Sequence, residues 1–267
     1  MYKPIAWIIT IGNELLVGRI VDTNAAWLAS RLTFLGASVR RIVTVGDTVD
    51  DIVAVLRDAL ASSDIVVTTG GLGPTDDDIT MEAVAAALNL PLVLNREALE
   101  HVSRFYSTKP AELTRERLKM ALLPLGAKPI PNPVGAAPGA HVSVGRSELF
   151  VLPGVPREMK PMFDSYVADK LKPILPELCV REKSVVVKGV AEADLAPLLR
   201  RASRECVSCY VKSHPKGHEA ESPLVDVRVL ASAPTCEEAD AMAQRVIGRL
   251  MELVGGGGGG GASSSVR

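Results

Sequence analysis

The stretch of sequence best suited to chemistry is a glycine-rich loop that ends in carboxylates, Gly70-Gly-Leu-Gly-Pro-Thr-Asp-Asp-Asp78. Gly70, Gly71 and Gly73 can adopt positive φ angles and let backbone N–H groups approach an oxyanion closely. Thr75 could cap the following helix or donate to a phosphate. The spacing matches neither the Walker loop, which needs a Lys-Ser/Thr pair, nor the dinucleotide pattern G-x-G-x-x-G. The loop therefore predicts a site of its own type for a phosphate-bearing ligand.

Three consecutive carboxylates, Asp76, Asp77 and Asp78, close this loop. Beside a bound phosphate they would repel it strongly at the effective dielectric of a protein cleft. A divalent cation such as Mg²⁺, Mn²⁺ or Co²⁺ removes this conflict, because hard carboxylate oxygens hold the ion and the ion bridges to phosphate. The helix macrodipole explains one acidic residue at a helix start, but explains three beside a glycine triplet less well. We therefore predict a metal site on these three residues.

A second polar cluster follows the first expected strand and comprises Gly12, Asn13, Glu14, Gly18, Asp22, Thr23 and Asn24. The carboxyl ends of the first and third strands of a parallel sheet share one edge, so Glu14 and Asp22 are expected to face the same cleft as the aspartates. Asn24 is equally well interpreted as a helix N-cap. Asp47, at the end of the second strand, is either a turn residue or a third wall of the cleft.

The elements that would position these residues alternate in type. The continuous apolar run at residues 6–11 indicates a strand buried on both faces. Residues 39–45 and 64–68 are expected to form the second and third strands. Amphipathic patterns at 24–35, 48–60 and 79–88 indicate helices. Three strand–helix alternations in about 90 residues predict βαβ units and a parallel sheet with right-handed crossovers.

The second half of the chain is less regular. The expected elements are a helix over 96–121 interrupted near Pro110, an irregular proline- and glycine-rich segment at 129–139, a hairpin of 141–144 with 148–152, and a helix over 157–169. After residue 176 the pattern changes to strands at 185–187, 210–212 and 224–230 with helices at 192–202 and 237–253, which indicates a small α+β domain. The glycine- and serine-rich tail from 255 to 267 cannot bury a core and is expected to be disordered.

The composition argues against several classes of partner. The formal net charge is −1 and aromatic residues make up only 4% of the chain, so neither a basic field nor base-stacking platforms favour nucleic acid or an anionic membrane surface. No apolar stretch approaches the roughly 20 residues that span a bilayer. The apolar run at residues 6–11 is too short for a signal peptide, so a cytoplasmic protein is expected.

The four cysteines are Cys179, Cys206, Cys209 and Cys236. Cys206 and Cys209 have the C-x-x-C spacing, and zinc would require a second close pair of cysteines or a close pair of histidines. Cys179 and Cys236 are isolated in the sequence, whereas His214 and His218 lie nearby. Buried or surface thiols are therefore expected, whereas a disulfide is expected only if the source is a hyperthermophile.

Four motifs together resemble a known family. They are Thr10-Ile-Gly-Asn-Glu-Leu-Leu-Val-Gly-Arg-Ile-Val-Asp-Thr-Asn24, Gly70-Gly-Leu-Gly-Pro-Thr-Asp-Asp-Asp-Ile-Thr80, Asn132-Pro-Val-Gly-Ala-Ala-Pro-Gly139 and Leu152-Pro-Gly-Val-Pro-Arg-Glu-Met159. They are similar to the signatures of the N-terminal domain of the CinA (competence/damage-inducible) family, which is related to the molybdopterin-binding domains of MogA, MoeA and gephyrin. The resemblance covers residues 5–170 strongly and the remainder more loosely.

This resemblance implies a three-layer α/β/α fold with a mostly parallel sheet in residues 1–172, followed by the small α+β domain in residues 173–254. It also implies self-association as a dimer or trimer. Asp47 and Asp78 match the two catalytic aspartates of the molybdopterin branch, and Glu14 joins them as a candidate general base. The expected ligand contacts are Gly12, Asn13, Asp22, Asn24, Gly70, Gly71, Gly73, Pro74, Thr75, Thr80, Asn132, Gly135, Gly154, Pro156 and Glu158.

Three functions remain open at this stage. The CinA branch implies metal-dependent hydrolysis of the pyrophosphate in ADP-ribose or a similar dinucleotide. The molybdopterin branch implies binding or adenylylation of a pterin phosphate with the same loop. A non-catalytic nucleotide-binding module is the third. Full-length bacterial CinA proteins carry a further C-terminal domain that deamidates nicotinamide mononucleotide; nothing in this sequence is long enough to be that domain, so that activity is not expected.

Overall fold

A computed structural model describes residues 2–216, 223–256 and 264–266. The chain divides into two compact units, residues 1–33 with 37–176 and residues 177–267 with 34–36. Each unit has its own apolar core, in keeping with the compactness expected of domains. The two are therefore described separately.

The first unit is built on a six-stranded sheet in the order β2-β1-β3-β8-β7-β6. Its parallel strands are β1 (Ile5–Ile11), β2 (Ser38–Val45), β3 (Ile65–Thr69) and β8 (Ser147–Leu152). The antiparallel strands β7 (Gly139–Val144) and β6 (Lys128–Ile130) complete it. All five residues of β3 are buried, as expected for a central parallel strand covered on both faces.

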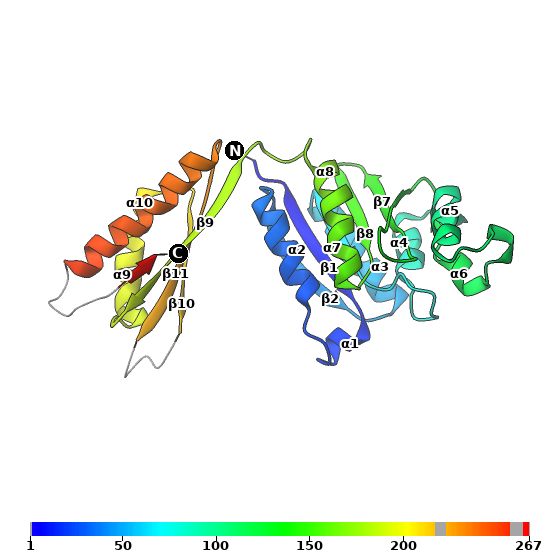
Figure 1. Cartoon of the computed structure of the whole chain (residues 1–267), viewed down its shortest axis with the longest axis horizontal. Helices are drawn as coiled ribbons and strands as arrows, with labels where there is room; N and C mark the ends of the chain where they lie inside the picture. Colours follow the sequence, from blue (N-terminus) through cyan, green and yellow to red (C-terminus); the bar gives the residue numbers. More distant parts are fainter. Residues whose placement is uncertain (1, 217–222, 257–263, 267) are drawn as a thin grey trace. The chain divides into compact units, whose positions relative to one another are not determined.

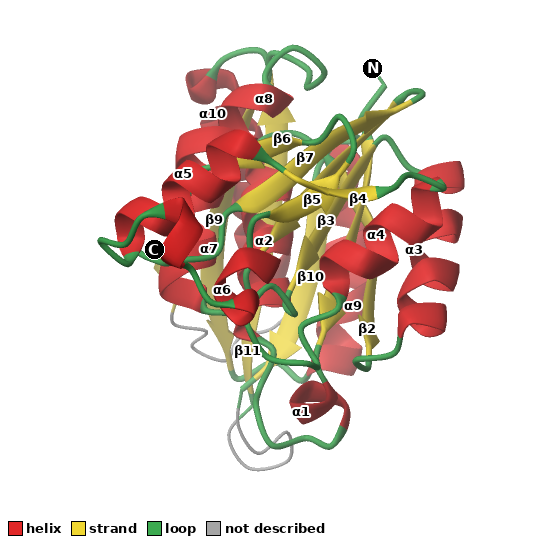
Figure 2. Ribbon diagram, turned by 90° about the vertical axis from the view of Figure 1, so that its right-hand side faces the viewer, coloured by secondary structure: helices red, strands yellow, loops and turns green. Residues whose placement is uncertain are grey.

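Helices cover both faces of this sheet, so the unit is a three-layer α/β/α structure, as predicted (Figures 1 and 2). On one face lie α2 (Thr23–Phe34) and α7 (Pro156–Met162), which continues through a π-helical turn into α8 (Ala168–Leu171). The rings of Trp27, in α2, and Phe163, in the π-helical turn, pack edge to face with their centroids 5.4 Å apart. On the other face lie α3 (Val49–Ser62) and α4 (Thr80–Leu88), which pack on each other.

The segment expected as one interrupted helix over 96–121 consists of separate pieces. These are α5 (Arg96–Phe105), a 3-10 turn at Pro110–Glu112 and α6 (Arg115–Lys119). The helical path ends at Ser107, whose φ is 51°, and α6 begins again where the Thr114 side chain accepts from the Arg117 N–H. The three-residue strands β4 (Leu92–Leu94) and β5 (Leu122–Pro124) pair beside it, and a one-turn helix α1 (Asn13–Leu16) follows β1.

The second unit is an antiparallel sheet in the order β10-β11-β9-β12. It comprises β9 (Cys179–Lys188), α9 (Glu192–Ala202), a 3-10 turn (Ser203–Glu205), β10 (Tyr210–Pro215), β11 (Leu224–Ala233) and α10 (Cys236–Gly255). Thr235 starts α10 with a capping box, since its side chain accepts from the Glu238 N–H and Glu238 accepts in return from the Thr235 N–H.

The expectations for the tail and for the thiols need correction. Residues 264–266 form β12 (Ser264–Val266), which pairs with the outer edge of β9. An open strand edge readily pairs with an extended segment. Most of the remaining tail lies outside the described residues. The cysteines form two disulfides, Cys179–Cys236 and Cys206–Cys209. β11 pairs Ala233 with Cys179 and then turns into α10, and this register brings Cys236 within bridging distance.

Among the helices that the structure describes, none is long and apolar enough to cross a membrane.

Candidate functional site

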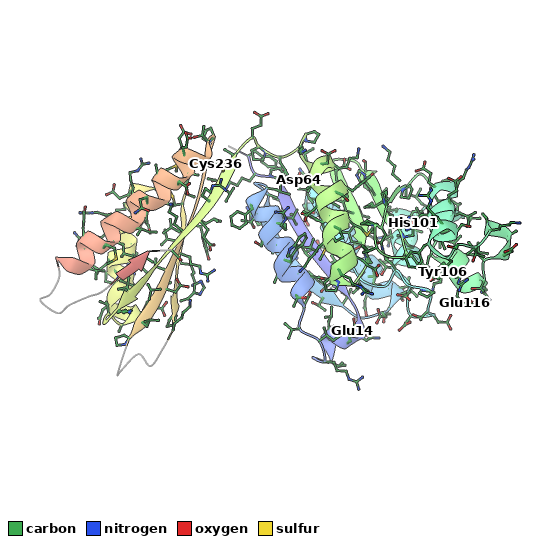
Figure 3. All side chains as sticks on the ribbon, in the orientation of Figure 1. Glu14, Asp64, His101, Tyr106, Glu116 and Cys236 are labelled. Carbon is green, nitrogen blue, oxygen red and sulfur yellow. A yellow bond between two sulfur atoms is a disulfide. The ribbon has the colours of Figure 1, made fainter. Side chains whose placement is uncertain are left out.

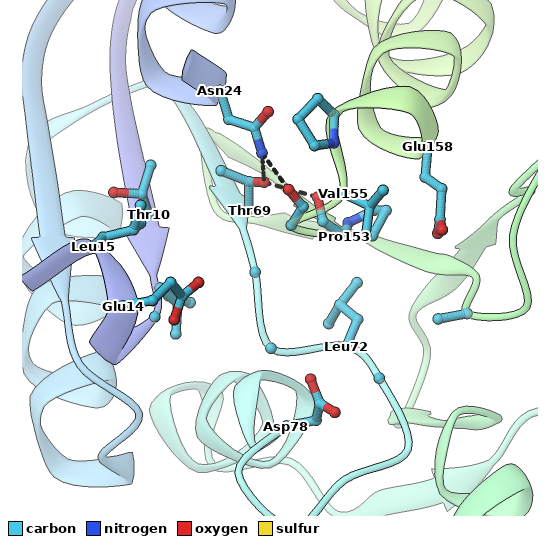
Figure 4. A pocket seen from close by; sticks show the side chains of 18 of the residues that line it. Thr10, Glu14, Leu15, Asn24, Thr69, Leu72, Asp78, Pro153, Val155 and Glu158 are labelled. Atoms are coloured by element: carbon cyan, nitrogen blue, oxygen red, sulfur yellow. Dashed lines mark hydrogen bonds between the residues drawn. The ribbon is translucent and has the colours of Figure 1, made fainter. Parts of the chain in front are cut away.

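A cleft of about 650 Å³ opens at the carboxyl edge of the parallel strands. Its lining includes Thr10 near the end of β1, Thr69 at the end of β3 and Pro153 just after β8 (Figure 4). Asp47, which follows β2, also lines it. This is the edge at which parallel α/β sheets place ligands, and the volume lies within the range of small-molecule sites.

Most of the residues expected from the sequence line this one cleft. They are Gly12, Glu14, Asp22, Asn24, Asp47, Gly70, Gly71, Gly73, Pro74, Asp77, Asp78, Gly154, Pro156 and Glu158. Six others lie outside its lining, namely Asn13, Thr75, Asp76, Thr80, Asn132 and Gly135.

The glycine loop is held tightly against β1 and α4. Gly70 has a φ of 118°, and a Cβ there would overlap the carbonyl oxygen of Ile11. Gly71 has a φ of 63°, and a Cβ there would overlap the hydroxyl of Thr80. That hydroxyl donates to the Gly70 carbonyl oxygen over 2.9 Å. Both positions therefore require glycine, and Thr80 acts as a support for the loop.

The aspartates that end the loop are not equivalent. The Thr75 hydroxyl lies between two of them, contacting Asp77 Oδ1 closely and Asp78 Oδ2 at 2.6 Å. The hydrogen bond from Thr75 is the main reason why the pKa of Asp77 lies below its ordinary value. Lys119 donates to the carbonyl oxygen of Thr75 and so places a positive charge behind the loop. Asp76 is exposed and makes no hydrogen bond or ion pair within the described part of the chain.

Asn13 and Asp47 lock the loops after β1 and β2 together. The Asn13 N–H donates to Asp47 Oδ2 over 2.8 Å, and the Asp47 N–H donates to Asn13 Oδ1 over 3.4 Å. Glu14, on the adjacent turn, is exposed, and its carboxylate makes no hydrogen bond or ion pair with any residue that the structure describes. Glu14 is therefore the carboxylate at this end of the cleft with all its lone pairs available to a ligand or water.

The proline- and glycine-rich segment is ordered by a side-chain network. Asn132 is buried and donates to Glu158 Oε2 over 2.8 Å and to the Ala137 carbonyl oxygen over 2.9 Å. Its Oδ1 accepts from the Gly135 N–H over 2.8 Å. A Cβ on Gly135 would overlap the Glu158 carboxylate. Asn132 and Gly135 therefore position Glu158, which itself lines the cleft.

The hydrogen bonds at the start of α2 show whether Asn24 is the N-cap of this helix. Asp22 Oδ1 accepts from the Ala25 N–H over 2.8 Å, so the aspartate supplies the N-cap. Asn24 instead reaches across to β3 and β8, where its amide nitrogen donates to Thr69 Oγ1 over 3.0 Å and to the Gly154 carbonyl oxygen over 2.7 Å.

Comparison with known proteins assigns this arrangement to a family. The sequence profile described as "Probable molybdopterin binding domain" matches residues 7–175. The chain belongs to the molybdopterin-binding domain family. Within it the similarity to CinA is confirmed: the crystal structure of the protein CinA of Thermoplasma acidophilum, described as having unknown function, is 44% identical, covers 62% of this chain and 98% of that one, and superposes with a TM-score of 0.60.

Relatives of similar length occur in other organisms. A protein of Pyrobaculum calidifontis is 51% identical over 251 residues, covering 94% of this chain and 96% of its own. A protein of Aeropyrum pernix is 53% identical over 247 residues, covering 92% of each chain. These matches extend through both units.

Each CinA-like motif contributes to the cleft wall. Asn24, Gly73, Ala137 and Glu158 represent the four motifs there, one each. Sequence reasoning missed the apolar part of the lining, which consists of Leu15, Ile20, Val21, Leu72, Tyr106, Met120 and Val155 among others. Tyr106 follows α5 and is far from Glu14 in the sequence; Figure 3 labels both residues. The Arg117 guanidinium lies 4.0 Å from the Tyr106 ring centroid. Tyr106 and Met120 lie outside the four motifs, so only the fold could reveal that they line the cleft.

Proposed function

We propose that the cleft binds a nucleotide through its phosphates and hydrolyses a pyrophosphate bond with the help of a divalent cation, ADP-ribose being the ligand class that the CinA resemblance implies. The observation that carries the proposal is the meeting of the glycine-loop backbone with Glu14, Asp77 and Asp78 around one cleft. Backbone N–H groups suit the developing charge on phosphate oxygens, and carboxylates suit the cation and the attacking water.

The donor set fits a cation that is held together with its ligand. Within the described residues no group of three or more His, Cys, Asp or Glu side chains could hold a metal ion by itself. Asp77 and Asp78 nevertheless converge on the Thr75 hydroxyl and both line the cleft. Mg²⁺ is commonly bound by one or two carboxylates plus substrate phosphates, which matches such a pair. When bound, the cation would polarise the phosphates and offset their charge.

The roles of Asp47 and Glu14 follow from whether their carboxylates already accept hydrogen bonds within the protein. Asp47 Oδ2 already accepts from the Asn13 N–H, so Asp47 holds the wall of the cleft. Glu14 is open to the cleft, and we assign it the role of general base, which accepts a proton from the attacking water. Tyr106 and Met120 offer apolar surface on which a planar base could rest, with Arg117 behind the tyrosine ring.

The test is hydrolysis of ADP-ribose, followed as release of AMP and ribose 5-phosphate with Mg²⁺ or Co²⁺. We expect turnover that a chelator abolishes. Glu14→Gln should lower it by roughly 100-fold or more, the usual cost of losing an acid–base group, and Asp78→Asn should also lower it strongly, because it removes a carboxylate assigned to the cation. Asp76→Asn is the matched control, since Asp76 lies outside the cleft lining, and it should retain activity. Absence of AMP release above the Asp78→Asn background would refute the proposal.

The family match itself favours a second candidate, binding or adenylylation of a pterin phosphate in the same cleft. A fluorescent pterin that co-purifies with the protein, or ATP-dependent labelling of one, would support it. Tight binding of ADP-ribose without turnover under any metal would instead indicate a non-catalytic nucleotide-binding module. The self-association implied by the resemblance, as a dimer or trimer, stays a prediction, as does a cytoplasmic location.

A further inference from the structure

We propose that the free carboxylate oxygen of Glu158, Oε1, accepts a hydrogen bond from an N–H group on the edge of the ligand's base, and so determines which base the cleft takes. This inference rests on the proposed function, because it assigns the base of the nucleotide to one end of the same cleft. It gives Glu158, which the hydrolytic step does not use, the role of a specificity-determining residue.

The Glu158 carboxylate is held in one orientation by its surroundings. Its Oε2 accepts from the side-chain NH₂ group of Asn132 over 2.8 Å. That amide cannot turn over, because its nitrogen also donates to the Ala137 carbonyl oxygen over 2.9 Å and its Oδ1 accepts from the Gly135 N–H over 2.8 Å. Asn132 is 3% exposed, and a Cβ on Gly135 would overlap the Glu158 carboxylate. A side chain held by a buried neighbour in this way is in position before any ligand arrives.

The second oxygen of the same carboxylate is free and open to solvent. Oε1 makes no hydrogen bond or ion pair with any residue that the structure describes. Over the same residues, the side-chain N and O atoms that are both buried and without a partner are Asn24 Oδ1 and Thr68 Oγ1, so Oε1 of Glu158 is accessible. Glu158 lines the cleft, and Figure 4 shows it across the pocket from Glu14. Oε1 therefore offers its lone pairs to whatever occupies this end of the cleft.

The neighbours of Glu158 make this the end of the cleft that suits a base. The His101 ring nitrogen Nε2 lies 3.1 Å from the carbonyl oxygen of Gly135, so α5 packs against the same glycine as the Glu158 carboxylate. Tyr106 is the C-cap of α5 and Val155 is the N-cap of α7, the helix that carries Glu158, and both line the cleft. Apolar and aromatic surface of this kind holds a planar base by its faces and leaves the edge of the base for polar contacts.

The chemistry of the group that meets Oε1 follows from what a carboxylate oxygen accepts. An ionised carboxylate only accepts hydrogen bonds, so its partner must carry an N–H or an O–H. Phosphate oxygens are excluded, because they are acceptors as well and carry negative charge. Of the donors in a nucleotide, a base N–H is the one that lies at the edge of an apolar plane, which matches a carboxylate at the margin of apolar surface. In adenine that donor is the 6-amino group.

The inference is tested by equilibrium binding of AMP and of purine riboside 5′-monophosphate, which lacks the 6-amino group, in the presence of Mg²⁺ and measured by calorimetry. AMP should bind roughly tenfold more tightly, the usual effect of one hydrogen bond to a charged group. Glu158→Gln should bring this ratio to one or below, because the Asn132 NH₂ group can face only the glutamine oxygen, which leaves the glutamine NH₂ group towards the base. Asp76→Asn is the matched control: it is also a carboxylate-to-amide change, lies outside the cleft lining, and should keep the ratio.

Equal affinity of the unmodified protein for the two nucleotides would overturn the inference, as would a preference for AMP that persists in Glu158→Gln. Weaker binding of 2′-deoxy-AMP that Glu158→Gln removes would overturn it too, because Oε1 would then accept from a sugar hydroxyl. If Glu158→Gln fails to fold, Glu158→Asp takes its place, since it withdraws the carboxylate from the base and should also lower the ratio. Failure of both nucleotides to bind likewise overturns the inference, whereas the proposed function is judged separately by metal-dependent release of AMP from ADP-ribose.

Discussion

At the scale of single residues, Thr75 affects the ionisation of one aspartate of the loop, Asp77. Its hydroxyl bonds to both Asp77 and Asp78, and the bond to Asp77 lowers the pKa of that carboxyl. A carboxyl with a lowered pKa stays ionised at more acidic pH, and the stabilisation given by its partner is lost only as the pH falls through the lowered value. Thr75 thus extends the pH range over which this potential cation ligand is ionised to more acidic values.

Thr75→Val should therefore raise the pKa of Asp77 toward its ordinary value. The shift can be followed by NMR titration of the Asp77 carboxyl. Thr114→Val is a matched control, because the pKa of Glu116 is lowered by its own backbone N–H and then by Thr114. That control should move Glu116 upward and leave Asp77 unchanged. An Asp77 titration that is the same with and without Thr75 would contradict the assignment of the bond.

At the scale of elements, the glycine loop owes its shape to packing as well as to backbone freedom. Gly71→Ala should cost about 1–2 kcal/mol for the left-handed backbone and about 1–3 kcal/mol more for the overlap with Thr80. Gly126→Ala is the matched control, since Gly126 has a φ of 85° and open space around its Cβ position. Urea unfolding followed by tryptophan fluorescence measures both. Equal costs for the two variants would show that the Thr80 contact does not constrain the loop.

Most of the long helices and strands were predictable because the spacing of their apolar residues matches the faces that they bury. β3 reads as an apolar run because helices cover both its faces, and α9 was predicted with its observed bounds, Glu192–Ala202. β4, β5 and β6 were missed because three residues are too few to show a period. These short strands pair only because the surrounding fold places them side by side.

The candidate site was predictable where loops carry unusual composition and not elsewhere. Glycines and carboxylates after the strands mark the polar half of the cleft, since the topology of a parallel sheet brings strand ends together. Tyr106 and Met120 reach the cleft from a region whose path depends on where a helix breaks. The orientation of the Glu158 carboxylate also depends on Asn132 and Gly135, which are distant in the sequence, so no local pattern could signal it.

At the scale of the whole molecule, the two disulfides should stabilise the second unit alone and to different degrees. Cys179–Cys236 spans 57 residues and Cys206–Cys209 spans 3, so loop-closure entropy gives about 4 kcal/mol to the first and about 2 kcal/mol to the second. Replacing each pair by serines and unfolding in guanidinium should reproduce this order in far-UV circular dichroism. Both tryptophans, Trp7 and Trp27, lie in the first unit, so their fluorescence transition should stay in place. A fluorescence transition that shifts along with the dichroism would contradict the independence of the two units. A larger loss of stability for the Cys206–Cys209 pair would contradict the entropic origin of the effect.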